Sequence, residues 1–271
     1  MSAPVYCRDL PHIDTDVCIR CHSCVRECPS KVFSVGDDKA VSVKAENDCI
    51  SCGHCAAVCP PGAISMFGGV PERLPNTRFA PVDVISNHIM GKRSVRRYKD
   101  TPVPRDIIQS CLDITAYCPN GYNARAVGFT VITDRSLIAR LGNAVHEAMK
   151  GAPLPLVMQH WQQRHGAGEG EEDTVFWGAP CVVFSHYPAT WRKGVEDSTI
   201  ALAAAEMVAV SHGLGTLWLG AARALGTHPS LASLAGVPEG RKVVGGMTFG
   251  YPAVRFVREV PREPVPVNWV E

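Results

Sequence analysis

The sequence predicts an α+β chain of two domains, and three observations lead to this fold class. Its 271 residues exceed one typical domain of about 100–200 residues. A cysteine-rich stretch near the N-terminus repeats itself once. The remainder mixes helix-like and strand-like segments without the strict strand–helix alternation of a doubly wound sheet. The expected domains are residues 1–68 and 81–271, with a linker at 69–80.

The N-terminal repeat consists of two copies of the spacing C-x2-C-x2-C-x3-C-P. "CIRCHSCVRECP" begins at Cys18 and "CISCGHCAAVCP" at Cys49, so eight of the twelve cysteines fall at matching positions. Between the copies, "KVFSV", "GDDK" and "AVSVKA" predict two short strands around a polar turn. The stretch "FGGVPERLPNTRFAP" that follows is rich in Gly and Pro, which is typical of a linker.

The larger part carries helices and strands in mixed order. Helices are expected where apolar residues recur at helical spacing, in 81–94, 104–118, 134–150 and 197–213. Strands are expected where β-branched and aromatic residues gather, in 126–133, 179–187 and 241–252. The polar, Gly-rich stretch 160–173 is consistent with either an active-site lid or a plain solvated loop.

Charge and hydropathy restrict the partners and the compartment. With 27 Lys and Arg against 26 Asp and Glu, the chain is nearly neutral, which argues against nucleic acid and an acidic membrane surface. The longest apolar run is shorter than a membrane span and contains Glu206, and no signal peptide is recognisable. The cytoplasm is the expected compartment, where reduced thiols favour metal binding over a disulfide framework.

The doubled cysteine spacing resembles the bacterial 2[4Fe–4S] ferredoxins across residues 14–68. In that family each run gives three ligands to one cluster and its fourth cysteine to the other. The resemblance therefore implies two [4Fe–4S] clusters, with the following ligand sets: Cys18, Cys21, Cys24 and Cys59 for the first cluster, and Cys49, Cys52, Cys55 and Cys28 for the second.

Two alternatives for the cysteine repeat stay open. Zinc is one, although the third cysteine of each run and the trailing Cys-Pro are superfluous for a tetrahedral site. A purely structural pair of clusters is the other. Among the remaining cysteines, Cys111 and Cys181 lie in apolar patterns that predict core positions, while Cys7 and Cys118 are undecided.

Two clusters in one small domain suggest an electron relay, and this raises the question of the acceptor. A cluster passes single electrons, whereas most organic reductions need two, and a flavin connects these regimes. No G-x-G-x-x-G follows a predicted strand, so a Rossmann site is not indicated. Five segments instead follow in order: "GKRSVRRY" (91–98), "CPNGYNARAVGF" (118–129), "HGLGTLWLGAARAL" (212–225), "FGYP" (249–252) and "VPREPVPVNWV" (260–270). Together they resemble the FMN-dependent nitroreductase family over roughly residues 80–271.

The resemblance implies which residues bind the polar parts of FMN. Lys92, Arg93, Ser94 and Arg96 would serve the phosphate, the ribityl chain and the pyrimidine edge, and Arg262 would close on the phosphate. Arginine suits this role because its planar fork donates paired, charge-assisted hydrogen bonds. Lys92 stands where arginine is more usual and offers a point charge instead. Without the other segments, such a run of charges would be typical of a solvated surface.

Two further segments would approach the flavin ring. Pro119, Asn120 and Asn123 are expected to reach the flavin across a dimer interface. The backbone near Gly220 and Ala221 would approach flavin N5, where a side chain is an obstacle and a backbone N–H tunes the reduced ring. The family's Gln-Pro-Trp is replaced by "RAV" at 125–127, which leaves the contacts to the ring face and the substrate preference open.

The expected function is that of an iron–sulfur flavoprotein oxidoreductase. Single electrons would pass from two [4Fe–4S] clusters to FMN, which reduces a nitroaromatic, a quinone or an activated alkene. No side chain is expected to act as a catalytic acid or base, because the flavin carries the chemistry. A homodimer is implied, with an external ferredoxin or NAD(P)H as candidate donor. Two alternatives stay open: FMN oxidises a substrate and the clusters export electrons to a ferredoxin, or the protein is a non-catalytic redox carrier or sensor.

Overall fold

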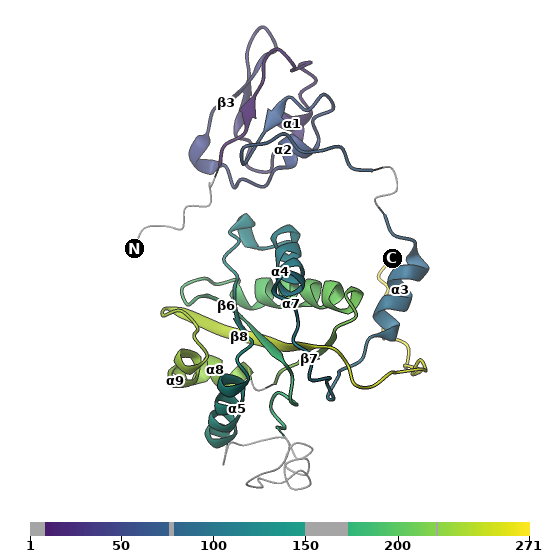
Figure 1. Cartoon of the computed structure of the whole chain (residues 1–271). Helices are drawn as coiled ribbons and strands as arrows, with labels where there is room; N and C mark the ends of the chain where they lie inside the picture. The colour runs from purple at the N-terminus through teal and green to yellow at the C-terminus, as the bar shows by residue number, and fades with distance from the viewer. Residues whose placement is uncertain (1–8, 76–78, 150–172, 221) are drawn as a thin grey trace. The chain divides into compact units, whose positions relative to one another are not determined.

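The computed structural model describes residues 9–75, 79–149, 173–220 and 222–271 (Figure 1). Contacts divide the chain into two compact units. The first comprises 1–79 and 119–125, and the second comprises 80–118 and 126–271. Three of the positions predicted from the sequence lie outside the described residues: Cys7, Ala221 and all but the last residue of the stretch 160–173.

The first unit consists of two small antiparallel sheets and short helices. In one sheet β1 (His12–Ile13) pairs with β4 (Ile64–Ser65), and in the other β2 (Phe33–Val35) pairs with β3 (Val41–Val43). The helices are α1 (Ser23–Glu27), α2 (His54–Ala57) and the 3₁₀ turn η1 (Glu46–Asp48). The expected pair of strands around a polar turn is confirmed as β2 and β3, where the Gly36 N–H donates to the Ala40 carbonyl at 2.9 Å.

The internal duplication is visible in the backbone as well as in the cysteines. In both copies, the residue before the second cysteine, the residue after it, and the third residue after the fourth cysteine have positive φ. These pairs are Arg20 and Ser51, His22 and Gly53, and Lys31 and Gly62. Such left-handed residues are uncommon outside glycine. Their recurrence shows that the two runs share one backbone path, and that the cysteine spacing specifies a local conformation.

The second unit is built on a four-stranded sheet with the strand order β5-β6-β8-β7. The strands are β5 (Gly128–Ile132), β6 (Cys181–Pro188), β7 (Gly215–Trp218) and β8 (Arg241–Gly250), and every pairing is antiparallel. This confirms the predicted α+β class. β7 is an addition to the three strands that the sequence predicts in this unit.

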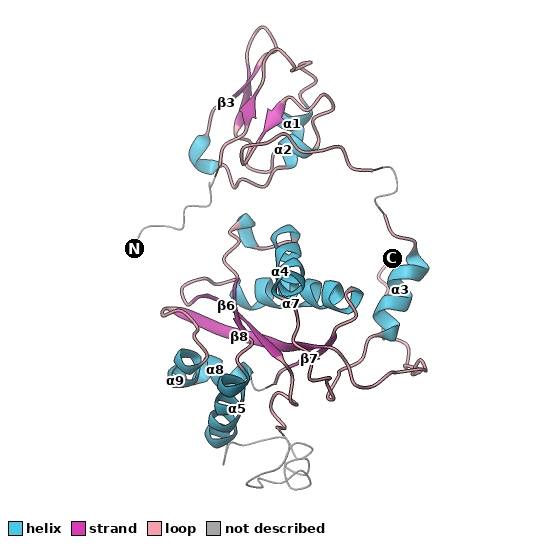
Figure 2. Cartoon of the chain, in the orientation of Figure 1, coloured by secondary structure: helices cyan, strands magenta, loops and turns pink. Residues whose placement is uncertain are grey.

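Helices cover both faces of this sheet (Figure 2). They are α4 (Arg105–Asp113) with the 3₁₀ turn η2 (Ile114–Tyr117) after it, α5 (Arg135–Met149), α7 (Gly194–Ser211), α8 (Ala222–Thr227) and α9 (Pro229–Leu234), whereas α3 (Val82–Gly91) lies to one side of the sheet. Side chains of β6 alternate between two buried clusters: Val182 and Phe184 face α5, α8 and α9, whereas Cys181 and Val183 face α4 and α7. No helix in the described ranges is long and apolar enough to span a membrane.

Helix α7 ends in a glycine, as the sequence predicts. Gly213 has φ of 76°, its N–H donates to the Val210 carbonyl at 2.9 Å, and the Leu214 N–H donates to the Ala209 carbonyl at 3.0 Å. This is the Schellman pattern, which satisfies the last carbonyls of a helix and turns the chain. The turn leads directly into β7, so residues of α7 and β7 that are close in sequence face each other.

Helix α3 was predicted from its apolar periodicity, but it buries none of its residues. Its attachment to the second unit includes a hydrogen bond of 3.0 Å between His88 Nε2 and the Met207 carbonyl of α7. The apolar side chains of this helix are exposed: Val82, Val84, Ile85, Ile89 and Met90.

Candidate functional site

A cavity in the first unit brings together cysteines from both runs. It is lined by Cys49, Cys52 and Cys55 of the second run and by Cys28 of the first, with Phe33 and Met66 among the apolar residues around them. These four thiols are the set that the ferredoxin resemblance implies for the second cluster. Four thiols around one apolar cavity are suitable ligands for an iron–sulfur cluster, which takes four cysteine thiolates.

Burial makes one of these thiols, Cys55, a poor acid in the absence of a metal. Burial, with a smaller contribution from the neighbouring Cys52, Cys28 and Cys49, raises the pKa of Cys55 to about 11. Because a metal binds the thiolate, loading a cluster must release the thiol protons. Within the described ranges, no three Cys, His, Asp or Glu side chains form a site for one metal ion. The fit to a cluster therefore rests on the four separate thiols around the cavity.

The first predicted ligand set is brought together less completely. Burial raises the pKa of Cys24, and Cys18 and Cys21 are close enough to raise it further. Cys59, the predicted fourth ligand, accepts the Ala63 N–H at 3.2 Å, just as Cys28 accepts the Val32 N–H at 3.5 Å. The two fourth cysteines thus have equivalent surroundings.

The segment 119–125 belongs to the first unit, although it comes from the middle of the chain. The side-chain amide of Asn123 donates to the carbonyls of Ile50 and Ser51 at 3.0 and 2.9 Å, between the first two cysteines of the second run. The Arg125 guanidinium lies 5.5 Å from the centre of the Phe67 ring. Asn123 therefore contacts a cysteine loop in this chain, while its role toward a flavin remains a prediction.

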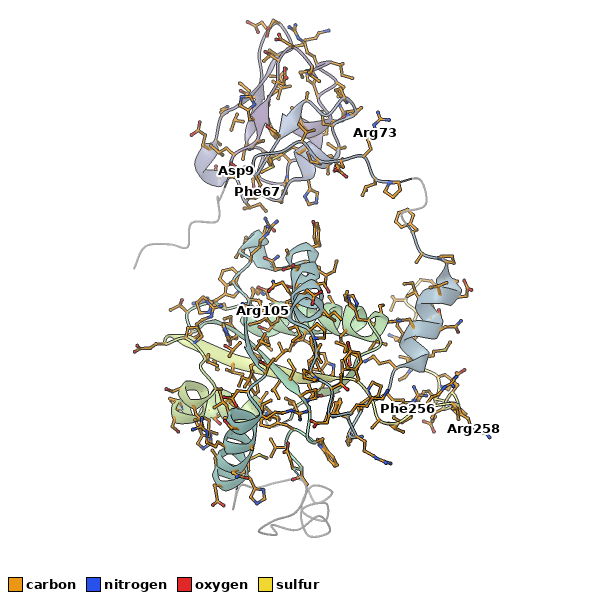
Figure 3. The ribbon with its side chains drawn as sticks, in the orientation of Figure 1. Asp9, Phe67, Arg73, Arg105, Phe256 and Arg258 are labelled. Carbon is orange, nitrogen blue, oxygen red and sulfur yellow. The ribbon has the colours of Figure 1, made fainter. Side chains whose placement is uncertain are left out.

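The same cysteine loop is held from another direction by Asp9. The Asp9 N–H donates to Ser51 Oγ at 3.0 Å, and Ser51 Oγ donates to the Asp9 carbonyl at 2.6 Å. The Asp9 carboxylate also accepts the N–H of Phe67 (Figure 3). Buried Ser51 is therefore fixed through its side chain and its carbonyl, which makes the loop between Cys49 and Cys52 rigid.

In the second unit, three of the segments that resemble the nitroreductases lie side by side. The segment 91–98 runs along β7, where the Val95 N–H donates to the Thr216 carbonyl at 2.8 Å. It then reaches the segment 249–252, where the Lys99 N–H donates to the Tyr251 carbonyl at 2.8 Å. Segments separated by more than a hundred residues thus form one continuous backbone surface.

Two glycines make this close packing possible. A Cβ at Gly215 would lie 2.6 Å from Val95 Cγ2, and a Cβ at Gly250 would lie 2.7 Å from Tyr98 Cδ1. The Tyr98 hydroxyl bonds Thr248 Oγ1 at 2.6 Å, and burial raises the pKa of Tyr98 to about 12. At exposed Gly220, by contrast, a Cβ would meet no described atom within 4 Å. Gly220 is therefore free to face a ligand.

The predicted phosphate-binding residues differ in their availability. Ser94, Arg96 and Arg262 are exposed. Arg96 lies 5.7 Å from the centre of the Trp177 ring, and Arg93 donates to the carbonyls of Met90 and Lys92 at the end of α3. Exposed Ser94 and Arg96, on either side of the residue that bonds β7, fit a phosphate-bearing cofactor.

Lys92 has a partner that the sequence analysis missed. Its Nζ lies 2.6 Å from Oε2 of Glu206, which is only 5% exposed. The carboxylate also accepts the Thr216 hydroxyl at 2.8 Å and the Trp218 indole N–H at 2.9 Å. One signal could have found this network: Glu206 is the only charged residue in "TIALAAAEMVAV", and buried carboxylates require partners.

Comparison with known proteins agrees with both units. Residues 89–251 match the Nitroreductase family, and residues 10–60 match a 4Fe-4S dicluster domain. An uncharacterized ferredoxin of Methanocaldococcus jannaschii is 43% identical over 56 residues, which is 20% of this chain and 89% of that protein.

Two solved structures share the fold of the second unit. A nitroreductase with bound FMN from Bacteroides fragilis has a TM-score of 0.59 and 22% identity, covering 69% of this chain and 98% of its own. An iodotyrosine deiodinase bound to FMN and 3-iodo-L-tyrosine has a TM-score of 0.56 and 17% identity, covering 69% and 99%. From the family match and the ferredoxin relative together, the chain belongs to the nitroreductase family and carries a ferredoxin-type 4Fe-4S dicluster domain ahead of it.

Proposed function

We propose that this protein is an FMN-dependent oxidoreductase in which two [4Fe–4S] clusters relay single electrons to the flavin, for the reduction of a small organic acceptor. The observation that carries the proposal is the cavity lined by Cys28, Cys49, Cys52 and Cys55. This cavity supports a cluster whose ligands come from both copies of the repeat. The rest of the chain belongs to a family of flavoenzymes.

In the first unit, the proposed task of the protein is to hold the clusters rigidly. The second cluster would be held by the four cavity thiols, and the first by Cys18, Cys21, Cys24 and Cys59. Bound clusters supply one-electron transfer over a range of potentials set by their surroundings. The hydrogen bonds to Ser51 and Ile50 stiffen the loop between two of these ligands, which limits the rearrangement that electron transfer requires.

In the second unit, the chain would bind FMN on the surface formed by 91–98 and β7. Bound FMN supplies the conversion between single-electron and two-electron chemistry. Arg96 and Arg262 are proposed to neutralise the phosphate and Ser94 to bond the ribityl chain. The open backbone at Gly220 would admit the ring, since no described side chain occupies that side of the glycine.

The proposed acceptors are nitroaromatics, quinones or activated alkenes. Their choice follows from the family, and the fold leaves it broad, because a deiodinase shares it. No acidic or basic side chain is assigned to catalysis. The cytoplasm stays the proposed compartment, because the cluster ligands must remain reduced thiols until they bind iron.

A homodimer is part of the proposal, and helix α3 supports it. Val82, Ile85 and Ile89 expose apolar side chains on a helix that buries no residue in the single chain. The C-terminal segment beyond β8 is likewise exposed and apolar, with Trp269 at 81% exposure. Exposed apolar side chains gathered on one helix are typical of an interface. Sedimentation equilibrium would measure the mass directly, and a monomer at micromolar concentration would contradict the dimer.

Anaerobic purification followed by counts of iron, sulfide, zinc and FMN tests the cofactors. We expect about eight irons, about eight sulfides and about one FMN for each chain. Steady-state assays with reduced ferredoxin, NADH and NADPH as separate donors then test the direction of flow. If the protein without clusters still reduces a nitroaromatic with NADH or NADPH as donor, the clusters are not an obligatory path for electrons to the flavin. Bound FMN that no small acceptor oxidises would instead favour a redox carrier.

A further inference from the structure

The network around Glu206 joins one buried carboxylate to three donors in the described part of the second unit. One buried carboxylate receives a cation from the end of α3 and two neutral donors from β7. The residues come from three places in the chain: Lys92 directly follows α3, Glu206 belongs to α7, and Thr216 and Trp218 belong to β7. Two of these three places are segments proposed to bind FMN.

The geometry determines how much charge Lys92 offers to a ligand. Its side chain is 28% exposed, and that of Glu206 is 7% exposed. At 2.6 Å and largely out of water, the opposite charges interact strongly and offset each other at any distance beyond a few ångströms. Lys92 therefore presents a nearly neutral ion pair, in contrast to exposed Arg96.

We propose that Glu206 is a positioning residue of the flavin site, which bonds Trp218 of β7, holds Lys92 beside that strand and keeps the midpoint potential of bound FMN low by neutralising Lys92. This inference rests on the proposed function, because it places FMN on the surface formed by 91–98 and β7. The physical reason is that reduction adds negative charge to the flavin. A free cation beside it would stabilise the reduced form, and an ion pair stabilises it much less.

The consequence concerns the substrate class. A flavin of low potential delivers electrons to acceptors that are difficult to reduce, and it needs a donor of still lower potential. Reduced [4Fe–4S] clusters reach such low potentials. The network thus favours the clusters over a weaker reductant as the immediate source of electrons.

The test is a double-mutant cycle with the midpoint potential of bound FMN as its readout. The variants are Glu206→Gln, Lys92→Gln and the combination of both, each compared with wild type in the full-length holoprotein by spectroelectrochemistry. Glutamine keeps the size of the glutamate side chain and one acceptor for Thr216 or Trp218. We expect Glu206→Gln to raise the potential, since it leaves Lys92 uncompensated, and Lys92→Gln to lower it.

The expected size is at least a tenfold change in the ratio of reduced to oxidised FMN at a fixed potential, which is about 30 mV for a two-electron couple. The double variant should return close to wild type, because it removes both charges. Asp100→Asn is the matched control. Arg135 and Asp100 also lie 2.6 Å apart, but their side chains are 44% and 99% exposed, so we expect no change in potential.

The inference is overturned if both single variants bind FMN and the ratio of reduced to oxidised FMN at a fixed potential stays within twofold of wild type. If Glu206→Gln fails to fold, the potential of Lys92→Gln tests the inference without it. The Lys92 side chain is partly exposed, so its removal need not disturb the core. A wild-type protein that binds no FMN would be a different result. It would refute the proposed function itself, and the inference with it.

Discussion

The candidate sites of the two units are built in opposite ways, one from residues close in sequence and the other from distant segments. In the first unit, most of the site is specified locally, since two short runs each place four cysteines and repeat the same left-handed backbone positions. In the second unit, the site is assembled from distant segments: Lys92 meets Glu206, and Val95 meets Thr216. The difference teaches that a repeated ligand spacing is readable from sequence, whereas a surface built from several segments depends on the packing that brings them together.

The strongest test of the locally specified site in the first unit is to remove single cysteines. Cys55→Ser and Cys28→Ser should give the same result, because both residues line one cavity. We expect the iron and sulfide content to fall by about half in each. Cys59→Ser should instead remove the other cluster and leave a different electron paramagnetic resonance spectrum.

Cys118→Ser serves as the control, since this half-buried thiol belongs to neither ligand set. It should retain the full iron content. If Cys28→Ser and Cys59→Ser lose the same cluster, the crossed arrangement of ligands is wrong.

The site assembled from distant segments in the second unit is tested most directly at Gly215. A Cβ there would lie 2.6 Å from Val95 Cγ2, so Gly215→Ala must push 91–98 away from β7. We expect a loss of about 1–3 kcal/mol in the free energy of unfolding, as for other overpacked positions, together with weaker FMN binding. Denaturant unfolding and fluorescence titration with FMN measure the two effects.

A second substitution sharpens that test. Val95→Ala removes Cγ1 and Cγ2, two of the three Val95 atoms that the new methyl group would approach, so adding it to Gly215→Ala should recover part of the lost stability. If the double variant is as unstable as the sum of the two single ones, direct contact between these residues does not explain the glycine.

A polar network in the sheet of the second unit predicts a pH dependence. His186 is 4% exposed, its Nδ1 accepts the Arg241 Nε–H at 2.5 Å, and Nε2 bonds Thr130 Oγ1 at 3.1 Å. Burial, reinforced by the charge of Arg241, lowers the pKa of His186 from 6.5 to about 4. Between these values the unfolded chain binds a proton that the folded chain does not, so stability decreases as the pH falls.

The expected decrease is about 2 kcal/mol between about pH 7 and about pH 5. Thermal unfolding of wild type and His186→Gln over this range measures it, and the comparison corrects for any effect of acid on the clusters. In His186→Gln the free energy of unfolding should not show this decrease between the two pH values. An identical pH profile in both proteins would show that His186 is not the group responsible.

The smallest expected effect concerns Asn123, which joins the local cysteine loop to the segment 119–125. Asn123→Ala removes two hydrogen bonds to the carbonyls of Ile50 and Ser51. We expect about 1–2 kcal/mol of lost stability in this loop, seen as faster release of iron from the second cluster to a chelator. Iron of the first cluster should be released at the wild-type rate.

Asn120→Ala is a useful comparison for that variant. Its side-chain oxygen accepts the Arg125 N–H at 2.9 Å, within the segment 119–125 itself. If it releases iron as fast as Asn123→Ala does, the conformation of the whole segment matters more than the two bonds of Asn123.

Much of the fold could be predicted from patterns, and the failures have a common cause. Helix α7 and strand β6 were expected because a long apolar stretch is stable when it is buried in the core of a folded unit. Strand β7 was missed because "GLGT" is also typical of a turn, and only its pairing with β8 makes it a strand. Helices α8 and α9 are short, with six residues each, and their small residues give little periodicity.

The sequence by itself determined the duplicated cysteine frame, the α+β class and the likeness to the nitroreductases, because each depends on residues close together in the chain or on their order. Only the tertiary structure decided that Lys92 pairs with Glu206, that Asn123 bonds a cysteine loop, and that Gly215 accommodates Val95. The physical reason is that a hydrogen bond or an ion pair requires a few ångströms of separation. For residues a hundred positions apart, packing alone sets that distance.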